Sequence, residues 1–418
     1  MIFSWVRLEK FLNYLLVFLL PTQLALHFWP PSSFVFGIRV DYLAPSFYLI
    51  DLMFLMLFIV WLRGNFGNLY KYIWKNRIPL IFLISLAVLN TIFSTSVIPS
   101  IYKWLKIFEL VVFYYYVRVR RDLFTSKTLF STFFYSLVFF SAIGILQFIL
   151  GRTIGGPLYL LGERNFTIST QGIALTDIFG KVYMRAYSTF SHPNSLAGYL
   201  GVGLITTLFV FSKKALIKRG WGVAIICLAF ALSFSLSAFI GVLFCGILYF
   251  LLRKKIVKAR YLIFIPSVFL LVSLALPFVS TSVLNNKTNL PQNISQRAYL
   301  TSISGTIISQ NFLLGTGLNT FVISESRTKV FDVYLWILQP VHNIFLLVFS
   351  ETGMLSLLFI YGGLMLLTKK AISLKNNLFY FVLAFVLVTG LADHYWFTLQ
   401  QNMFILAFIL GISFREEG

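Results

Sequence analysis

The sequence predicts an all-α, polytopic integral membrane protein that forms a single transmembrane domain over residues 1–418. Hydrophobic residues make up 59% of the chain and charged residues only 11%, too few to cover a soluble body of this size with polar surface. Apolar runs recur along the whole length, and many approach the ~17–25 residues with which a helix crosses a bilayer. Cations also alternate between successive connecting segments, which is typical of a membrane topology.

The apolar runs predict about 12 transmembrane helices joined by polar connections. In chain order, the predicted spans are residues 11–29, 46–62, 78–93, 104–117, 128–150, 194–211, 221–235, 237–252, 261–279, 342–367, 377–392 and 398–413. Two connections are much longer than the others, at about residues 151–193 and 280–341. The glycines and prolines of the first long loop predict an irregular surface or re-entrant structure.

The basic residues predict the orientation of the chain in the membrane. Of the 34 Lys and Arg residues, 23 lie in every second connecting segment, at residues 1–10, 63–77, 118–127, 213–219, 253–260, 369–375 and 415. Because short loops rich in Lys and Arg stay in the cytoplasm, both termini are predicted to be cytoplasmic and both long loops extracytoplasmic. This topology accounts for the net charge of +21, so no nucleic-acid partner is expected.

The two long loops gather cations that could bind an anion. The second loop predicts a helix over residues 292–310, which carries Arg297 and is ended by Gly315 and Gly317. The basic residues of both loops are Arg152, Arg164, Lys181, Arg185, Lys287, Arg297, Arg327 and Lys329. Taken alone, Arg297 is a solvated loop cation or an interface anchor. As a cluster, the planar guanidinium groups suit a phosphate or diphosphate.

His342 stands where the second loop meets an apolar run. A neutral imidazole there could take a proton from an attacking hydroxyl, although a histidine at a helix entrance also serves as a cap or an interface residue. Glu351 lies inside the apolar run, where a carboxylate costs ~2.5–3.5 kcal/mol unless it is paired or protonated. It either braces the helix bundle or lines the site. Helical periodicity places Gly353 on the face of His342.

A second polar pair, Asp393 and His394, lies in the last predicted extracytoplasmic turn. It is a candidate for a further contact to substrate. The sequence has no Asp-x-Asp pair and no Walker loop, and its four histidines are scattered. We therefore expect no metal, no cofactor and no use of ATP, so that a reaction would need a donor that is already activated.

Three stretches of the chain resemble the O-antigen ligase and O-antigen polymerase superfamily of bacterial envelope enzymes. They are Gln339-Pro340-Val341-His342-Asn343 with Glu351-Thr352-Gly353, the stretch 185–198 with its core Phe190-Ser191-His192-Pro193-Asn194, and Gly315-Thr316-Gly317 ahead of Asn319 and Phe321. The resemblance covers nearly the whole chain, and the ligase- or polymerase-like core is about residues 185–367. Such proteins have about a dozen spans with both ends in the cytoplasm.

The resemblance implies an inverting, metal-independent glycosyl transfer at the extracytoplasmic face of the bacterial cytoplasmic membrane. The donor would be a glycan on a polyprenyl diphosphate, and the acceptor a hydroxyl of a glycan, a lipid or a protein. Arg297 and His342 match the catalytic positions of the family. Arg185 matches a further basic position, and with Arg164 and Arg327 it would bind the diphosphate. The supporting residues would be Asn343, Glu351, His192, Asn194, Asp393 and His394.

One position departs from the family pattern. The family often has Ser-Arg-x-Ala where this chain reads Ser235-Leu236-Ser237-Ala238. If that arginine holds the diphosphate, Leu236 removes one contact, which Arg164 or Arg327 would replace unless the substrate differs.

Two alternatives to a ligase stay open at the level of sequence. One is a polysaccharide polymerase of the same superfamily, which extends glycan chains. The other is a transporter or flippase for a lipid-linked glycan, for which related halves and broken helices near the middle of the membrane are expected. The sequence shows no internal repeat, and its unusual polar residues gather at one face.

Overall fold

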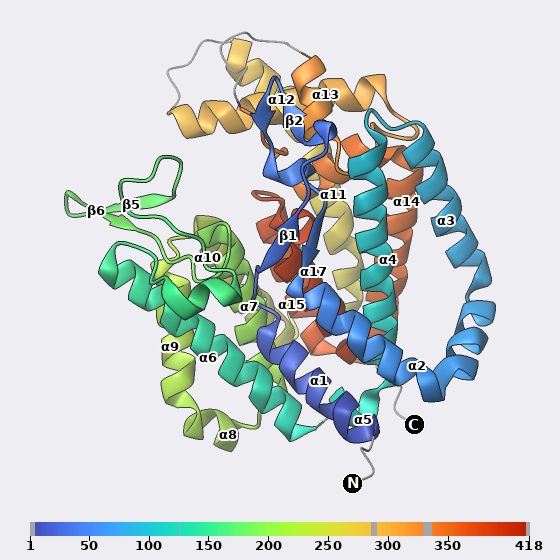
Figure 1. Cartoon of the computed structure of the whole chain (residues 1–418), viewed down its shortest axis with the longest axis vertical. Helices are drawn as coiled ribbons and strands as arrows, with labels where there is room; N and C mark the ends of the chain where they lie inside the picture. Colours follow the sequence, from blue (N-terminus) through green and yellow to red (C-terminus); the bar gives the residue numbers. More distant parts are fainter. Residues whose placement is uncertain (1–4, 125, 286–290, 329–336, 415–418) are drawn as a thin grey trace.

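The computed structural model describes residues 5–124, 126–285, 291–328 and 337–414. Helices form most of this structure, and three two-stranded sheets form small hairpins (Figure 1). The α-helices are α1 (Trp5–Leu19), α2 (Leu49–Lys75), α3 (Arg77–Ile92), α4 (Val97–Val119), α5 (Arg121–Phe124), α6 (Lys127–Leu150), α7 (Pro193–Val210), α8 (Lys213–Lys218), α9 (Gly220–Leu232), α10 (Leu236–Arg253), α11 (Ile265–Asn285), α12 (Gln292–Gln310), α13 (Phe321–Arg327), α14 (Ile344–Ser373), α15 (Asn377–Gly390), α16 (Tyr395–Thr398) and α17 (Gln400–Ser413). The strands are β1 (Ala25–His27), β2 (Phe34–Val35), β3 (Ile38–Arg39), β4 (Ser46–Tyr48), β5 (Leu175–Ile178) and β6 (Lys181–Met184), and the 3-10 helices are η1 (Pro31–Ser33), η2 (Asp41–Leu43), η3 (Gly156–Leu161) and η4 (Ala259–Phe264).

The predicted fold class is confirmed, and each of the predicted spans overlaps one α-helix. Among the described residues, six helices are long and apolar enough to cross a membrane, judged by length and composition: α2, α6, α7, α10, η4 with α11, and α14. Helices α3, α9, α15 and α17 are apolar but shorter. The chain is therefore a polytopic helical membrane protein, and the number of its crossings stays a prediction.

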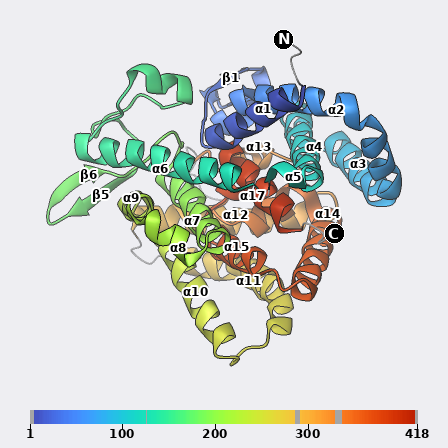
Figure 2. The ribbon, with the colours of Figure 1, turned by 90° about the horizontal axis from the view of Figure 1, so that it is seen from below.

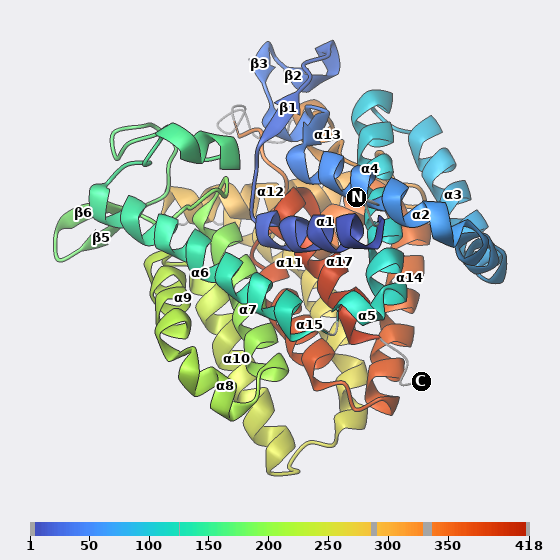
Figure 3. The ribbon, with the colours of Figure 1, turned by 60° about the horizontal axis from the view of Figure 1, so that its bottom comes forward.

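The first predicted span, residues 11–29, is wrong in its second half. Helix α1 ends at Leu19, and Pro21 follows, which has no amide hydrogen to continue the helix. The chain then becomes extended, and β1 pairs antiparallel with β4, with Ala25 opposite Tyr48. The short β2–β3 hairpin between these strands packs on α13 (Figure 3) through Val35 and Val322.

The long loops are structured. The loop over residues 151–193 contains η3 and the antiparallel β5–β6 hairpin but no helix of spanning length, as the glycines and prolines predicted. The second loop begins later than residue 280, because α11 continues to Asn285 as one hydrogen-bonded helix. Its predicted helix over residues 292–310 is confirmed as α12. Two of its predicted cations, Lys287 and Lys329, lie outside the described residues.

The predicted cytoplasmic segments meet at one end of the molecule, the lower end in Figure 1. Arg120, after α4, forms an ion pair with Glu9 of α1 at 2.5 Å. Asn376, before α15, donates a hydrogen bond to the backbone oxygen of Ser413 at the end of α17. The beginning of α1 and the end of α17 thus lie at the same end, where they contact the basic segments.

Helix α14 is interrupted near its first third. Gly353 has φ 72° and ψ −179°, a conformation outside the helix, so the expected helical face shared with His342 does not exist. The chain after α12 fills the break: the amides of Thr316 and Gly317 donate to the oxygens of Ser350 and Glu351 at 3.0 and 2.9 Å. A Cβ on Gly353 would meet the oxygen of Leu313 at 2.3 Å, so only glycine fits.

Asn90 of α3 stabilises this junction, because both the nitrogen and the oxygen of its buried side-chain amide form hydrogen bonds. Its nitrogen donates to the backbone oxygens of Leu314 and Glu351 at 2.7 and 2.8 Å. Its oxygen accepts from the indole of Trp104 and the amide of Leu318, both at 2.9 Å. One side chain therefore bonds four polar groups of the junction, of which the oxygen of Glu351 also accepts from the amide of Gly317.

We predict that Asn90→Ala destabilises the protein by about 3 kcal/mol or more, because it leaves several buried polar groups unpaired at roughly 1–3 kcal/mol each. Unfolding in detergent, followed by intrinsic fluorescence, measures the change. Asn68→Ala is the matched control, since the Asn68 side chain is exposed and bonds only Asn65. Equal stability of the two variants would show that Asn90 does not hold the junction.

Candidate active site

A chain of hydrogen bonds joins three of the predicted site residues at the upper end of the molecule. The Arg185 guanidinium donates to the oxygen of Asn194 at 2.6 Å. The amide nitrogen of Asn194 donates to a carboxylate oxygen of Asp393 at 2.9 Å. Arg185 also donates to the backbone oxygen of Ser233 at 2.6 Å. The first long loop, the start of α7 and the α15–α16 turn are thus connected through their side chains.

Helix capping positions the first of these segments. His192 is the N-cap of α7, and its Nδ1 accepts from the amide of Asn194 at 3.1 Å. Pro193 occupies the first helical position, where a missing amide hydrogen costs nothing. This local sequence places Asn194 on the first turn of a buried helix. Its side chain reaches Asp393, a contact that spans 199 positions of the chain.

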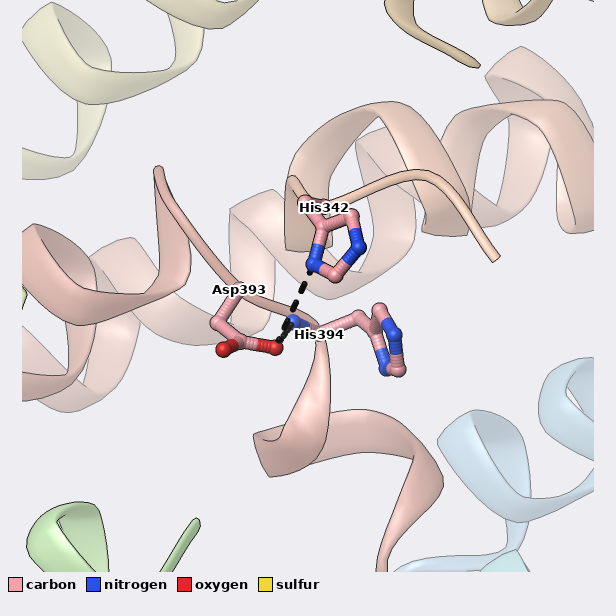
Figure 4. Close-up of side chains that lie close together, drawn as sticks. All are labelled: His342, Asp393 and His394. Atoms are coloured by element: carbon pink, nitrogen blue, oxygen red, sulfur yellow. Dashed lines mark hydrogen bonds and ion pairs between the residues drawn. The ribbon is translucent and has the colours of Figure 1, made fainter. Parts of the chain in front are cut away.

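His342 also lies beside Asp393. Its Nδ1 lies 3.7 Å from the Asp393 carboxylate, and the second ring nitrogen points away from it (Figure 4). The His342 side chain keeps 21% exposure, whereas its Nδ1 is buried. His342 precedes α14, which begins at Ile344. The N-cap is Asn343, whose side-chain oxygen accepts from the amides of Phe345 and Leu346 at 3.0 Å.

Asn343 and Arg297 attach two more segments to the α15–α16 turn. Asn343 donates to the oxygen of Leu391 at 3.3 Å. Arg297, on α12, donates to the oxygen of Ala392 at 2.9 Å. It lies near enough to act electrostatically on His394. The structure thus brings Arg297 and His342 to the same short turn, although they are far apart in sequence.

Asp393 is the centre of this arrangement and is held as a carboxylate. Burial by itself raises the pKa of Asp393, but the contact and charge of His342 outweigh it and hold the pKa below its usual range. One carboxylate oxygen also accepts from the amide of His394 at 2.9 Å. Burial lowers the pKa of His394 to about 3, so this imidazole is neutral near pH 7. Its Nδ1 shares a hydrogen bond with Thr398 at 2.8 Å.

The histidines are less scattered than the sequence suggested. Ligand atoms of His342, Asp393 and His394 lie within 4.8 Å of one another, a spacing that a metal ion could bridge. Both carboxylate oxygens already accept hydrogen bonds, from Asn194 and from the amide of His394. The charges of Arg185 and Arg297 nearby favour an anion over a cation. The cluster is thus a carboxylate whose two oxygens are already bonded, beside two imidazoles and near two guanidinium groups.

A cavity of about 570 Å³ opens beside this cluster and is called the His342 cavity below. Its wall includes His192, His342, Asp393 and His394, together with residues of the segment between α1 and α2. Arg164 also lines it. The preceding Glu163 is buried and fixes the loop, accepting from Gln147 at 2.7 Å and from two backbone amides.

Lys103 of α4 is a site residue that sequence reasoning missed. It is only 6% exposed, lines the His342 cavity and lies about 9 Å from the first residue of its helix. Its ammonium contacts the sulfur of Met403 at 3.4 Å, and within the described residues no carboxylate lies at ion-pair distance. The sequence analysis missed it because the predicted span begins at residue 104, whereas α4 begins at Val97 and places this lysine inside an apolar helix, where a cation marks a functional position by default.

Lys106, one turn further along α4, differs from Lys103 because its charge is compensated. It forms ion pairs with Asp51 and, at 3.2 Å, with Glu109. Gln400 donates to the other oxygen of Asp51. The sequence had indicated the local pair with Glu109 but not the partner on α2. Of these two cavity lysines, Lys103 is therefore the one whose charge is free to meet an anion.

Two predicted residues lie outside the site. Glu351 accepts from the amide of Phe321 at 3.1 Å and does not line the cavity, so it braces the helix junction rather than lining the site. Arg327 is exposed at the end of α13 and does not line the cavity either. The structure therefore gives no support to Arg327 as a diphosphate ligand.

Leu236, the position at which this chain departs from the family pattern, lies just after a turn that Arg185 contacts. Leu236 begins α10 and is 73% exposed. Arg185 donates to Ser233 in the turn just before it. A guanidinium from the first long loop therefore lies against the turn that precedes Leu236.

We predict that the stability of the protein falls on acidification partly through His394. Its pKa is about 3 in the folded state and near 6.5 in an unfolded chain, so the unfolded state binds more protons below pH 6.5. Lowering the pH from 7.5 to 5.0 should lower the free energy of unfolding by up to about 2 kcal/mol through this group.

Unfolding measured at both pH values should show a smaller pH effect in His394→Gln. The exposed His27→Gln is the control and should behave as wild type. An unchanged pH effect in His394→Gln would contradict the assignment.

A family model described as O-antigen ligase matches residues 221–361, from α9 into α14. The matched part contains Arg297 and His342, whereas Lys103, Arg185 and Asp393 lie outside it. Among curated proteins, none matches the chain. The match supports a ligase- or polymerase-like membrane enzyme that acts on glycans. The match covers about a third of the chain, residues 221–361, and it confirms the resemblance of this part to the O-antigen ligase superfamily.

Proposed function

We propose that the protein transfers a glycan from a polyprenyl diphosphate to an acceptor hydroxyl at the extracytoplasmic face of the bacterial cytoplasmic membrane. The observation that carries this proposal is the placement of His342 against Asp393, at the edge of a cavity. Among the described residues, two cations of its lining, Lys103 and Arg164, have no carboxylate at ion-pair distance. A base, a carboxylate that orients it and an anion-binding wall are the groups that such a transfer needs.

In the proposed reaction, the acceptor oxygen attacks the anomeric carbon of the donor sugar from the face opposite the diphosphate. The bond between that carbon and the diphosphate oxygen breaks, so the configuration inverts. The proton of the acceptor passes to the second ring nitrogen of His342, which points away from Asp393. Asp393 holds the ring by its Nδ1 and stabilises the imidazolium that forms.

The departing diphosphate is negatively charged, and the cations of the site stabilise it. A polyprenyl diphosphate departs without needing a proton if positive groups stabilise it. Lys103 and Arg164 line the cavity, and Arg297 lies beside the Asp393 turn. Arg185 is engaged with Ser233 and Asn194, so we assign it to positioning Asn194 and Asp393. Its charge also adds to the field at the cluster.

The test is transfer by the purified protein in liposomes, using a defined polyprenyl-diphosphate oligosaccharide and several acceptors, with products identified by mass. We expect a new glycosidic bond, formed equally well with a chelator present. His342→Gln should lose about 10²–10⁴-fold in rate, and Arg297→Gln roughly 10- to 100-fold through lost charge-assisted bonds. A product chain that grows from lipid-linked acceptors identifies a polymerase, and one joined to a different acceptor identifies a ligase.

The control is Arg152→Gln, which removes an exposed arginine of the first long loop that does not line the cavity. It should transfer at the wild-type rate. Full activity of both the His342 and Arg297 variants would refute the site. Movement of labelled donor across the bilayer with no new bond would instead identify a transporter.

We predict that Lys103→Met weakens the use of donor. The substitution removes the buried charge but keeps an apolar chain of similar length beside Met403 and Phe397, so the protein should still accumulate. If Lys103 contacts the diphosphate, KM for the donor should rise about tenfold or more, while KM for the acceptor stays the same. Lys71→Met removes an exposed lysine of α2 and is the control. An unchanged donor KM would show that Lys103 is only a structural residue.

A further inference from the structure

A second cavity lies at the opposite end of the molecule from His342. Its volume is about 530 Å³, and it is enclosed by the end of α7, the end of α10 with the following turn, and the start of α15. We call it the basic cavity. Figures 1 and 2 show the turn after α10 at the lower end, where the other basic segments lie. The distribution of Lys and Arg assigns this end to the cytoplasm.

Three cations line the basic cavity: Arg253, Lys255 and Lys258. All three are exposed, and no carboxylate of the described residues pairs with them. They are fixed by a folded turn, in which the amides of Lys255 and Ile256 donate to the oxygens of Leu252 and Leu251 at 3.1 and 3.0 Å. The topology of the chain alone explains cations at this end, but it does not require three of them to border one open cavity.

The wall opposite the cations offers hydrogen-bond donors. Asn377, the first residue of α15, lines the cavity, and the free amides of a helix start attract anions. Tyr380, one turn further, also lines it and is 4% exposed. Its hydroxyl is buried and has no hydrogen-bond partner. A buried hydroxyl without a partner is costly, and an anion in the cavity would satisfy it.

The remaining wall is aromatic and apolar. Phe209 of α7 stacks on Phe381 of α15 with ring centroids 5.1 Å apart, and both line the cavity. From the cavity, the exposed side chains of Phe250, Ile247 and Leu243 continue along α10. An anionic head and an apolar tail would therefore find matching surfaces side by side.

We propose that the basic cavity binds the headgroup of an anionic phospholipid of the inner leaflet, with its acyl chains along α10. Arg253, Lys255 and Lys258 pair with the phosphate, and the Tyr380 hydroxyl donates to it. The apolar continuation on α10 selects a membrane lipid over free phosphate, which shares the same charge. This binding is independent of the glycan transfer proposed above, since it uses no residue of the His342 cavity.

The experiment counts lipids bound to the purified full-length protein by native mass spectrometry. Phosphatidylglycerol is compared with phosphatidylcholine of the same acyl chains, and with inorganic phosphate. We expect the wild type to bind phosphatidylglycerol at least about tenfold more tightly than phosphatidylcholine, since each cation near anionic headgroups contributes roughly fivefold. Inorganic phosphate should neither bind detectably nor displace the lipid.

Two variants and a matched control decide the outcome. The triple variant Arg253→Gln, Lys255→Gln, Lys258→Gln should lose the preference for phosphatidylglycerol, and Tyr380→Phe should weaken it severalfold. The control Lys213→Gln, Lys214→Gln, Lys218→Gln removes three cations from α8, which do not line the cavity, and should keep the preference. Retention in the triple variant, an unchanged Tyr380→Phe, equal loss in the control, or displacement of lipid by inorganic phosphate would overturn the proposal.

Discussion

A buried carboxylate at Asp393 must be compensated by hydrogen bonds and positive charge, and this requirement organises the end of the molecule that holds the candidate site. A charged group away from water is tolerated only where hydrogen bonds and charges compensate it. Asn194, the amide of His394 and the ring of His342 supply these contacts. Each comes from a different part of the chain, so satisfying one carboxylate fixes the relative positions of the first long loop, α7, the entrance of α14 and the α15–α16 turn.

The need to pair buried polar groups also explains the structure around the break in α14. Breaking α14 at Gly353 frees backbone groups at a depth where water is scarce, and such groups must find partners within the protein. The chain following α12 and the Asn90 amide provide them. Glu351 completes the junction by accepting from Phe321. The junction fixes residues 314–321 against α3 and α14, and so joins the end of α12, which carries Arg297, to the helix that His342 precedes.

The two ends of the protein differ in their distribution of charge. At the end predicted to be cytoplasmic, cations are abundant and mostly exposed, and one cavity gathers three of them beside a buried hydroxyl without a partner. At the other end, the charges are fewer and more buried, and most have a defined partner. Lys103 and Arg164 are the exceptions within the His342 cavity. Uncompensated positive charge there is what an anionic leaving group requires.

The sequence by itself determined the fold class, a helix at each predicted span and the helix bearing Arg297, because apolar length, proline and glycine act locally. The family resemblance also predicts His342 and Arg297 as the catalytic residues. The sequence misplaced residues 20–29, which form no helix because strand pairing decides their structure. The role of Arg327 as a diphosphate ligand stays a prediction. Only the tertiary structure placed Asp393 beside His342, moved Glu351 into the helix junction, put Arg185 in the turn before Leu236 and turned Lys103 toward the cavity. These are contacts between residues far apart in the chain, and packing sets them rather than any local pattern.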